Sequence, residues 1–255
     1  MRRIKLVLEY CGTRYAGWQI QPNAVTVQGT VEACLARITN GRVRLHAAGR
    51  TDAGVHARRQ VAHFDTTATI AVPALLRGLN SLLPEDIAVR QATDVPNDFH
   101  ARYSARQKTY AYLIHNRPQR SAFAAPYTWY VPQPLDVAAM RLAAQALLGR
   151  HDFSAFRAAS CAARSPVRCL SRLTVQRRAE RLIIMMCADG FLQHMVRNIV
   201  GTLVAIGRGR MPAQAMPAIL ASRQRQQAGP TAPPQGLCLV RVMYAAATPV
   251  PEAGV

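Results

Sequence analysis

The residues best able to do chemistry lie in the segment 48–56, which reads AGRTDAGVH. Its only carboxylate, Asp52, lies between Arg50 and the adjacent Arg58 and Arg59, and nearby cations favour the ionised form of a carboxyl group. An ionised carboxylate can act as a nucleophile or as a base at neutral pH. Asp and Gly are also common in tight turns with a solvated arginine, and the pattern alone favours that structural interpretation.

Hydrophobic periodicity predicts the elements that must position this segment. The first half of the chain has the order β-α-β-β-α-β, with elements at 4–10, 26–39, 43–47, 60–64, 72–83 and 87–92. The second half repeats the order with one extra short helix, at 109–115, 136–148, 168–176, 182–187, 191–206, 212–221 and 237–244. The segment that carries Asp52 is therefore expected to connect two strands.

The β-α-β-β-α-β order is the ferredoxin-like, or RRM-like, pattern, and here it occurs twice. We expect an α+β fold with a first half (residues 1–105), a second half (residues 106–248) and a tail (residues 249–255). The two halves are expected to join their sheets edge to edge into one extended antiparallel sheet, because that arrangement removes exposed inner edges. A central cleft would lie where the halves meet.

The charge of the chain indicates a polyanionic partner. The 255 residues include 32 Lys+Arg and 13 Asp+Glu, a net charge of +19, and 30 of the basic residues are arginine. Arginine suits phosphate recognition, so nucleic acid is the favoured partner, although arginine-rich codon usage with a need for solubility is an alternative. The second half is the more basic and is the expected phosphate-binding part.

Cysteine usage and hydropathy give expectations about metals and compartment. The six cysteines form no C-x-x-C pair, no histidine cluster has zinc-like spacing, and no metal site is predicted. No run of about 20 apolar residues exists, so no membrane span is predicted. The N-terminal apolar run is too short for a signal peptide. These features predict a reduced, cytoplasmic protein.

Six blocks of sequence occur in a fixed order along nearly the whole chain. They lie at 10–21 (Y-x-G-x-x-Y-x-G-W-Q-x-Q), 48–57 (AGRTDAGVHA), 98–114 (DFHAR, then KTYAYLI), 151–157 (HDFSAFR), 191–201 (FLQHMVRNIVG) and 231–237. In these blocks the chain closely resembles the tRNA pseudouridine synthase A family. Two departures are Cys11, where the family usually has Asp, and Cys238, where an aromatic residue is common. Neither lies at a position assigned a role below.

The resemblance implies an isomerisation that needs no cofactor or metal. In the family reaction, uracil is detached from C1′ of its ribose, rotated, and rejoined through C5. Asp52 corresponds to the catalytic carboxylate. It would act by covalent addition or by removing the 2′ proton to give a glycal, and the sequence leaves both routes open. Either route requires an ionised Asp52 close to the sugar.

The resemblance also implies roles for three further residues. Arg197 corresponds to the partner of the catalytic acid, with a solvated surface arginine as the alternative. Arg50 corresponds to a residue that helps to displace the target base, which fits base flipping, with simple phosphate binding as the alternative. Tyr110 is expected to stack on the flipped uracil, with a core aromatic as the alternative. His194 is expected to be a packing or hydrogen-bonding residue.

Members of the family act as homodimers on the anticodon stem-loop of tRNA, at nucleotides 38, 39 and 40, so tRNA and a second copy of the chain are the implied partners. Other function classes were weighed against this one. A non-catalytic RNA-binding protein with two RRM-like units would be expected to carry the RRM aromatic motif, which the chain lacks. A glycosidase-like hydrolase would need a second carboxylate near Asp52. A pseudouridine synthase acting on another RNA is a further alternative.

Overall fold

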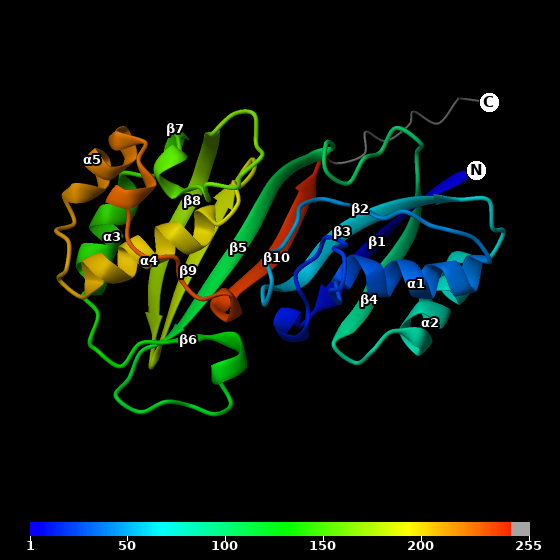
Figure 1. The fold of residues 1–255 in the computed structure, drawn as a ribbon, viewed down its shortest axis with the longest axis horizontal. Coiled ribbons are helices and arrows are strands. Elements are labelled where there is room, and N and C mark those ends of the chain that lie inside the picture. Colours follow the sequence, from blue (N-terminus) through cyan, green and yellow to red (C-terminus); the bar gives the residue numbers. More distant parts are fainter. Residues whose placement is uncertain (246–255) are drawn as a thin grey trace, which may run out of the picture.

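The computed structural model describes residues 1–245 as one ten-stranded, mostly antiparallel sheet with helices packed against it (Figure 1). The strand order is β4-β1-β3-β10-β5-β9-β8-β7, with β2 attached to β3 and β6 to β5. The strands are β1 (Arg2–Tyr10), β2 (His46–Ala47), β3 (His56–Thr66), β4 (Ile87–Val95), β5 (Ala105–His115), β6 (Trp129–Tyr130), β7 (Gly149–Asp152), β8 (Val167–Arg178), β9 (Arg181–Ala188) and β10 (Leu237–Tyr244).

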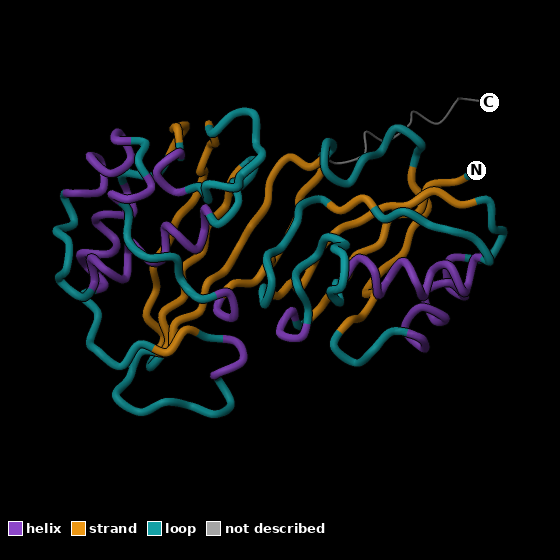
Figure 2. Tube along the Cα trace, in the orientation of Figure 1, coloured by secondary structure: helices purple, strands orange, loops and turns teal. Residues whose placement is uncertain are grey.

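Five α-helices and five short 3-10 helices lie within the described residues. The α-helices are α1 (Val27–Thr39), α2 (Val72–Leu82), α3 (Val137–Gln145), α4 (Met195–Gly207) and α5 (Ala215–Ser222). The 3-10 helices are η1 (Gly12–Arg14), η2 (Ala125–Tyr127), η3 (Ser154–Phe156), η4 (Arg225–Gln227) and η5 (Pro234–Gly236). The helices form two groups, α1 with α2 and α3 with α4 and α5, as the purple segments of Figure 2 show. None of these helices has both the length and the apolar composition needed to cross a membrane.

The elements largely follow the predicted order, with three differences. The strand predicted at 43–47 is reduced to β2, because the amide of Leu45 donates to the Glu32 carboxylate of α1 (2.8 Å). Strands β6 and β7 are only two and four residues long, too short to give a periodic signal. The helix predicted from 191 begins at Met195, because His194 has a left-handed backbone (φ 61°).

The sheet is continuous where the two halves of the sequence meet. In the first half the order is β4-β1-β3 with β2 on β3, and in the second half it is β10-β5-β9-β8-β7 with β6 on β5. The join between β3 and β10 is parallel and covers two residue pairs, Cys238 with His56 and Leu239 with Ala57. The sheet was predicted to be antiparallel, and two short pairings differ: β10 runs parallel to β3 at the seam, and β6 runs parallel to β5.

Helix α4 is the most deeply buried helix of the second half. Twelve of its thirteen residues are buried, so it lies between the sheet and the segment that follows η4. A side chain on Gly201 would place its Cβ 1.6 Å from the carbonyl oxygen of Pro230, so only glycine allows that segment to cross the helix. This crossing brings the segment to the first turn of α4. The predicted tail (249–255) lies outside the described residues.

Candidate active site

Asp52 lies at the seam between the two halves. It belongs to the Asp52 loop (residues 48–55), which connects β2 to β3. Its Oδ2 atom is 3.1 Å from Nη1 of Arg197 and 3.5 Å from Nε2 of His194. The Asp52 side chain is 27% exposed and the Arg197 side chain 13%, so the carboxylate is accessible while its partner is largely covered. The structure therefore brings together two predicted site residues that are 145 positions apart.

Arg197 is fixed by contacts on two sides. It lies in the first turn of α4, and its Nε donates to the carbonyl oxygen of Ala232 at 2.7 Å. The Ala232 amide in turn donates to the carbonyl oxygen of Arg197 at 3.1 Å. Because the guanidinium group is held by this backbone exchange, its remaining nitrogens point at Asp52 in a set direction. This is the geometry expected of a charge-assisted hydrogen bond.

His194, expected to be a packing or hydrogen-bonding residue, lies beside the Asp52 carboxylate. Its left-handed backbone places it just before α4, and this position turns the ring towards the carboxylate. The helix predicted from residue 191 would have included His194, but α4 begins after it. The only signal for His194 in the sequence is its place in the block that contains Arg197.

The first half holds the Asp52 loop by several hydrogen bonds. The Tyr10 hydroxyl and Thr51 Oγ1 share one of 2.9 Å, and the Trp18 amide donates to the Thr51 carbonyl oxygen at 3.0 Å. Gln60 Nε2 donates to the Gly49 carbonyl oxygen at 2.8 Å. Burial raises the pKa of Tyr10 to about 12, so its hydroxyl keeps its proton at neutral pH. The loop on either side of Asp52 is thus tied to β1, β3 and the 11–18 segment.

Two glycines allow the 11–18 segment to pack directly on the Asp52 loop. A Cβ on Gly12 would lie 2.0 Å from the Val55 carbonyl oxygen, and a Cβ on Gly17 would lie 2.7 Å from the Thr51 carbonyl oxygen. Gly17 also has a φ of +92°, which other residues rarely adopt. The glycine spacing of the first sequence block therefore follows from the close approach of two backbones.

We expect Gly17→Ala to destabilise the protein and to disturb the Asp52 loop, because the new methyl group would both clash and strain the backbone. Strain of this kind costs about 1–3 kcal/mol. Urea unfolding would measure the loss, with Gly41→Ala as the matched control, since a Cβ on Gly41 meets nothing closer than 3.9 Å. Equal stabilities of the two variants would contradict the packing argument.

Tyr110 and Tyr112 lie on the same face of β5 but have different surroundings. Tyr112 is fully buried, and its hydroxyl donates to the Pro233 carbonyl oxygen at 2.7 Å, so it anchors the segment that carries Ala232. Tyr110 is 7% exposed and packs edge-on against Phe191, with ring centroids 5.1 Å apart. Burial, with smaller effects from Tyr10 and Asp52, raises the pKa of Tyr110 well above its usual range. Tyr110 is therefore a neutral phenol beside the carboxylate.

The arginines nearest to Asp52 in the sequence are not its partners in space. Arg58 and Arg59 are exposed on β3, and within residues 1–245 neither forms an ion pair with Asp52. Arg50 is exposed and makes no hydrogen bond or ion pair with any described residue. The guanidinium neighbour predicted from the loop is instead supplied by Arg197, and Arg50 is free to meet a ligand.

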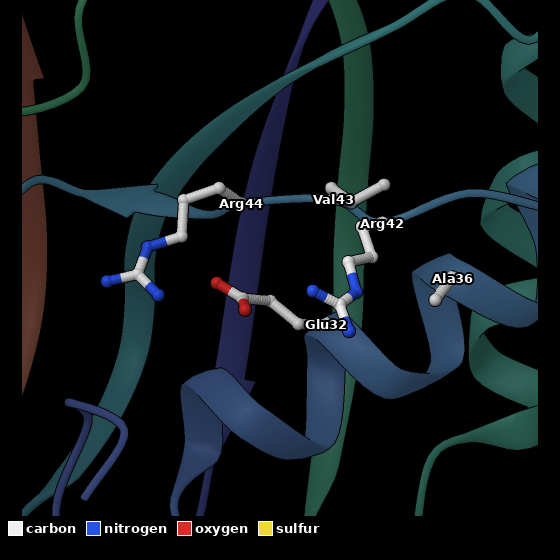
Figure 3. Close-up of a pocket in the computed structure, with 5 residues that line it drawn as sticks. All are labelled: Glu32, Ala36, Arg42, Val43 and Arg44. Carbon is white, nitrogen blue, oxygen red and sulfur yellow. The ribbon is translucent and has the colours of Figure 1, made fainter.

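A hollow of about 380 Å³ lies apart from this site, on α1 and the segment that precedes β2. Figure 3 shows its lining, with Glu32 projecting from α1 towards the segment that carries Arg42 and Arg44. Glu32 also accepts hydrogen bonds from Gln28 and from the Leu45 amide. These bonds fix the segment that leads to the Asp52 loop. Among the described residues, no group of His, Cys, Asp and Glu is arranged to hold a metal ion.

Comparison with known proteins gives a consistent family. The family model described as tRNA pseudouridine synthase matches residues 6–104 and 143–245. Proteins named tRNA pseudouridine synthase A are similar over nearly their full length. That of Myxococcus xanthus is 51% identical over 96% of this chain and 92% of its own, and that of Moorella thermoacetica 52% over 94% and 99%. That of Geotalea uraniireducens is 48% identical over 96% and 100%. With its Asp52–Arg197 pair placed at the seam of one continuous sheet, the chain belongs to the tRNA pseudouridine synthase family.

Proposed function

We propose that this chain isomerises uridines of the anticodon stem-loop of tRNA to pseudouridine, at nucleotides 38, 39 and 40. The observation that carries the proposal is the ion pair between Asp52 and Arg197 across the seam. A carboxylate that is partly exposed and held by a largely covered guanidinium group keeps a fixed position while it remains accessible. Such a group can reach the ribose of a nucleotide only when that nucleotide has left its helix.

Asp52 is proposed to react at the sugar, by addition at C1′ or by removal of the 2′ proton. Tyr110, a neutral phenol beside it, is proposed to stack on the extruded uracil and to assist the late removal of the C5 proton. Base–aromatic stacking contributes about 1–3 kcal/mol. Arg50, exposed and without a described partner, is proposed to occupy the place that the base leaves. Arg197 would hold the carboxylate in a fixed direction throughout the reaction.

Recognition of tRNA is proposed to rest on shape and phosphate contacts, because one enzyme that serves three adjacent nucleotides cannot depend on one set of base edges. The net charge of +19 supplies the necessary cations.

We expect tRNA affinity to fall at least about tenfold when the salt concentration rises from about 50 to about 200 mM, because bound phosphates release counterions. A filter-binding titration at several salt concentrations measures the slope. Asp52→Asn provides the control and should keep the same slope, since Asp52 contacts no phosphate. A flat dependence in the wild-type protein would contradict phosphate-dominated binding.

The chain is proposed to act as a homodimer. Beyond the helix-covered face, the second half presents a partly exposed apolar face of the sheet, formed by Ala111 opposite Met185 and Leu113 opposite Ile183. Contiguous apolar surfaces of this kind mark contacts with other proteins. A second copy of the chain would bury this face, and the mass of the protein in solution tests the assembly.

The two halves, 1–105 and 106–248, are proposed to be ferredoxin-like units with the active-site cleft between them. The strand orders β4-β1-β3-β2 and β10-β5-β9-β8 support this, because each places the first strand of its half next to the last. A cytoplasmic location is proposed as well. It is supported by six cysteines that are all free, as a reducing compartment would keep them.

The experiment that tests the proposed function is chemical mapping of pseudouridine in tRNA treated with the purified protein. Derivatisation specific for pseudouridine should mark nucleotides 38, 39 and 40 and no others. Mass spectrometry of the same RNA separates the alternatives, since isomerisation leaves the mass unchanged and hydrolysis would free uracil. Unmodified tRNA after treatment would contradict the proposal, and marks elsewhere would contradict its site specificity.

A further inference from the structure

We propose that Lys108 is a positioning residue for Asp52, which it aligns by holding the start of the Asp52 loop from the second half. This inference rests on the proposed function of Asp52. Lys108 lies on β5, on the same face as Tyr110, and its Nζ donates to the carbonyl oxygen of Ala48 at 2.6 Å. Ala48 precedes Asp52 by four residues, so the ammonium group acts on the loop backbone and not on the carboxylate itself.

Lys108 gives the loop backbone a hydrogen bond that comes from the second half of the chain. The other hydrogen bonds to backbone groups of residues 48–51 come from Trp18, Gln60 and Val61, all within residues 1–105. Among the described residues, three polar side chains of the second half contact this loop. Arg197 and His194 contact the carboxylate of Asp52, and Lys108 contacts the backbone at the start of the loop.

Lys108 links the two halves at a point where β3 and β10 are no longer paired. After the two pairs that join β3 to β10, the strands diverge, and a cavity of about 210 Å³ lies between Arg59 and Val61 on one side and Arg241 and Val242 on the other. Val242 is the register partner of Lys108. The Lys108 side chain therefore crosses from β5 to the loop where backbone pairing between the halves has ended. Lys108 thus adds a hydrogen bond between the halves to the one that the Tyr244 hydroxyl donates to the Ala101 carbonyl oxygen at 2.8 Å.

The environment of Lys108 makes its charge costly. The side chain is partly buried, and two neighbouring cations, Arg102 and Arg168, oppose its charge, while Asp189 favours it. Burial, reinforced by those cations, lowers the pKa of Lys108 to about 8. Within residues 1–245, Lys108 forms no ion pair, so its described partner is the Ala48 carbonyl. The charge strengthens the bond to Ala48, because a hydrogen bond from a charged donor is about twice as strong as one from a neutral donor.

The site also suits lysine better than the arginine that dominates this chain. Lys5 and Lys108 are the only lysines among 32 basic residues. A Cβ on Gly49 would lie 3.3 Å from the Lys108 ammonium group, so the space around Nζ is narrow. An ammonium group is a compact charge on a flexible stem, and it fits where a planar guanidinium group would be crowded.

The test compares Lys108→Met with Lys108→Arg and with the matched control Lys5→Met, since Lys5 lies over the Phe99 ring, away from the Asp52 loop. We expect Lys108→Met to lower the single-turnover rate of pseudouridine formation by about 10- to 100-fold, because small displacements of a reacting group are costly. Its dissociation constant for tRNA should stay within about twofold of wild type, as the residue is not a phosphate contact. Lys108→Arg should recover part of the rate, and Lys5→Met should match the wild type.

The pH profile gives a readout that a purely structural role would not move. As pH rises through about 8, Lys108 loses its proton and its bond to Ala48 weakens, so the wild-type single-turnover rate should fall by about threefold. The charge of arginine persists in this range, and methionine has none, so both variants should lack this limb. The relevant neighbours, Arg102, Arg168 and Asp189, are unchanged in all three proteins.

Three results would overturn the inference. One is a Lys108→Met variant with weaker tRNA binding and an unchanged rate at saturation, which would make Lys108 a phosphate contact. Another is a wild-type limb near pH 8 that persists in Lys108→Met. The third is a normal rate in Lys108→Met. If the wild-type protein itself forms no pseudouridine, the proposed function fails instead, so the two failures are distinguishable.

Discussion

Asp52→Asn is expected to abolish pseudouridine formation while leaving tRNA binding largely intact. The amide has nearly the shape of the carboxylate but no negative charge, so it can neither add to C1′ nor remove the 2′ proton. Loss of a group at the centre of the reaction lowers rates by about 10³-fold or more. Single-turnover formation of pseudouridine, measured with a saturating excess of protein over tRNA, would show the loss directly.

The matched control for this variant is Asp98→Asn, an identical chemical change at an exposed carboxylate outside the Asp52 loop. It should leave both rate and affinity near those of the wild type. Near-normal pseudouridine formation by Asp52→Asn would overturn the assignment of this residue. A loss of tRNA binding in the same variant would show that the carboxylate instead supports the fold of the binding surface.

Arg197→Met is expected to have the second largest effect, a fall in rate of about 10²-fold. The substitution removes the 3.1 Å contact to Asp52 and the 2.7 Å contact to Ala232, and it leaves His194 as the remaining described partner of the carboxylate. Without its guanidinium neighbour, Asp52 is less firmly aimed, and misalignment is costly in rate. Single-turnover rates of the variant and the wild type measure the effect.

Arg197→Lys separates the two contributions of the guanidinium group. It keeps a positive charge but cannot contact Asp52 and Ala232 at once with the same planar fork, so an intermediate rate is expected. Arg210→Met, at an exposed position just beyond α4, is the control for removing a positive charge. If Arg197→Met turned over tRNA as fast as Arg210→Met, the ion pair would have no part in the reaction.

The elements of the fold were predictable because their apolar faces are periodic. Residues 4, 6 and 8 of β1 are fully buried, and so are most residues of α4, as alternation and helical spacing predicted. The errors fall where a local interaction replaces periodicity. The Glu32 carboxylate binds the Leu45 amide and shortens the strand at 43–47, and the left-handed His194 delays the start of α4.

The sequence predicted which residues belong to the candidate site better than it predicted which atoms those residues contact. The motif blocks marked Asp52, Arg50, Tyr110 and Arg197. The structure pairs Asp52 with Arg197, and it places Tyr110 close enough for Asp52 to contribute to the raised pKa of that phenol. The roles of these residues stay predictions. Lys108 and Gln60 carried no signal of their own, because each acts through a side chain that reaches a distant backbone carbonyl. Such a contact depends on how distant segments of the chain are placed, and the identity of a lysine or a glutamine does not indicate that placement.

The sequence by itself determined the order of the elements, the basic character of the chain and the loop that carries Asp52. The residues of the loop by themselves pointed to neighbouring arginines such as Arg58 and Arg59, and the family resemblance implied Arg197. The tertiary structure decides between them, because it pairs Asp52 with Arg197. The physical reason is that local spacing fixes which face of a strand or helix is apolar, whereas an ion pair between residues 52 and 197 depends on where β10 enters the sheet. That placement follows from the packing of the whole chain, so no short stretch of sequence contains it.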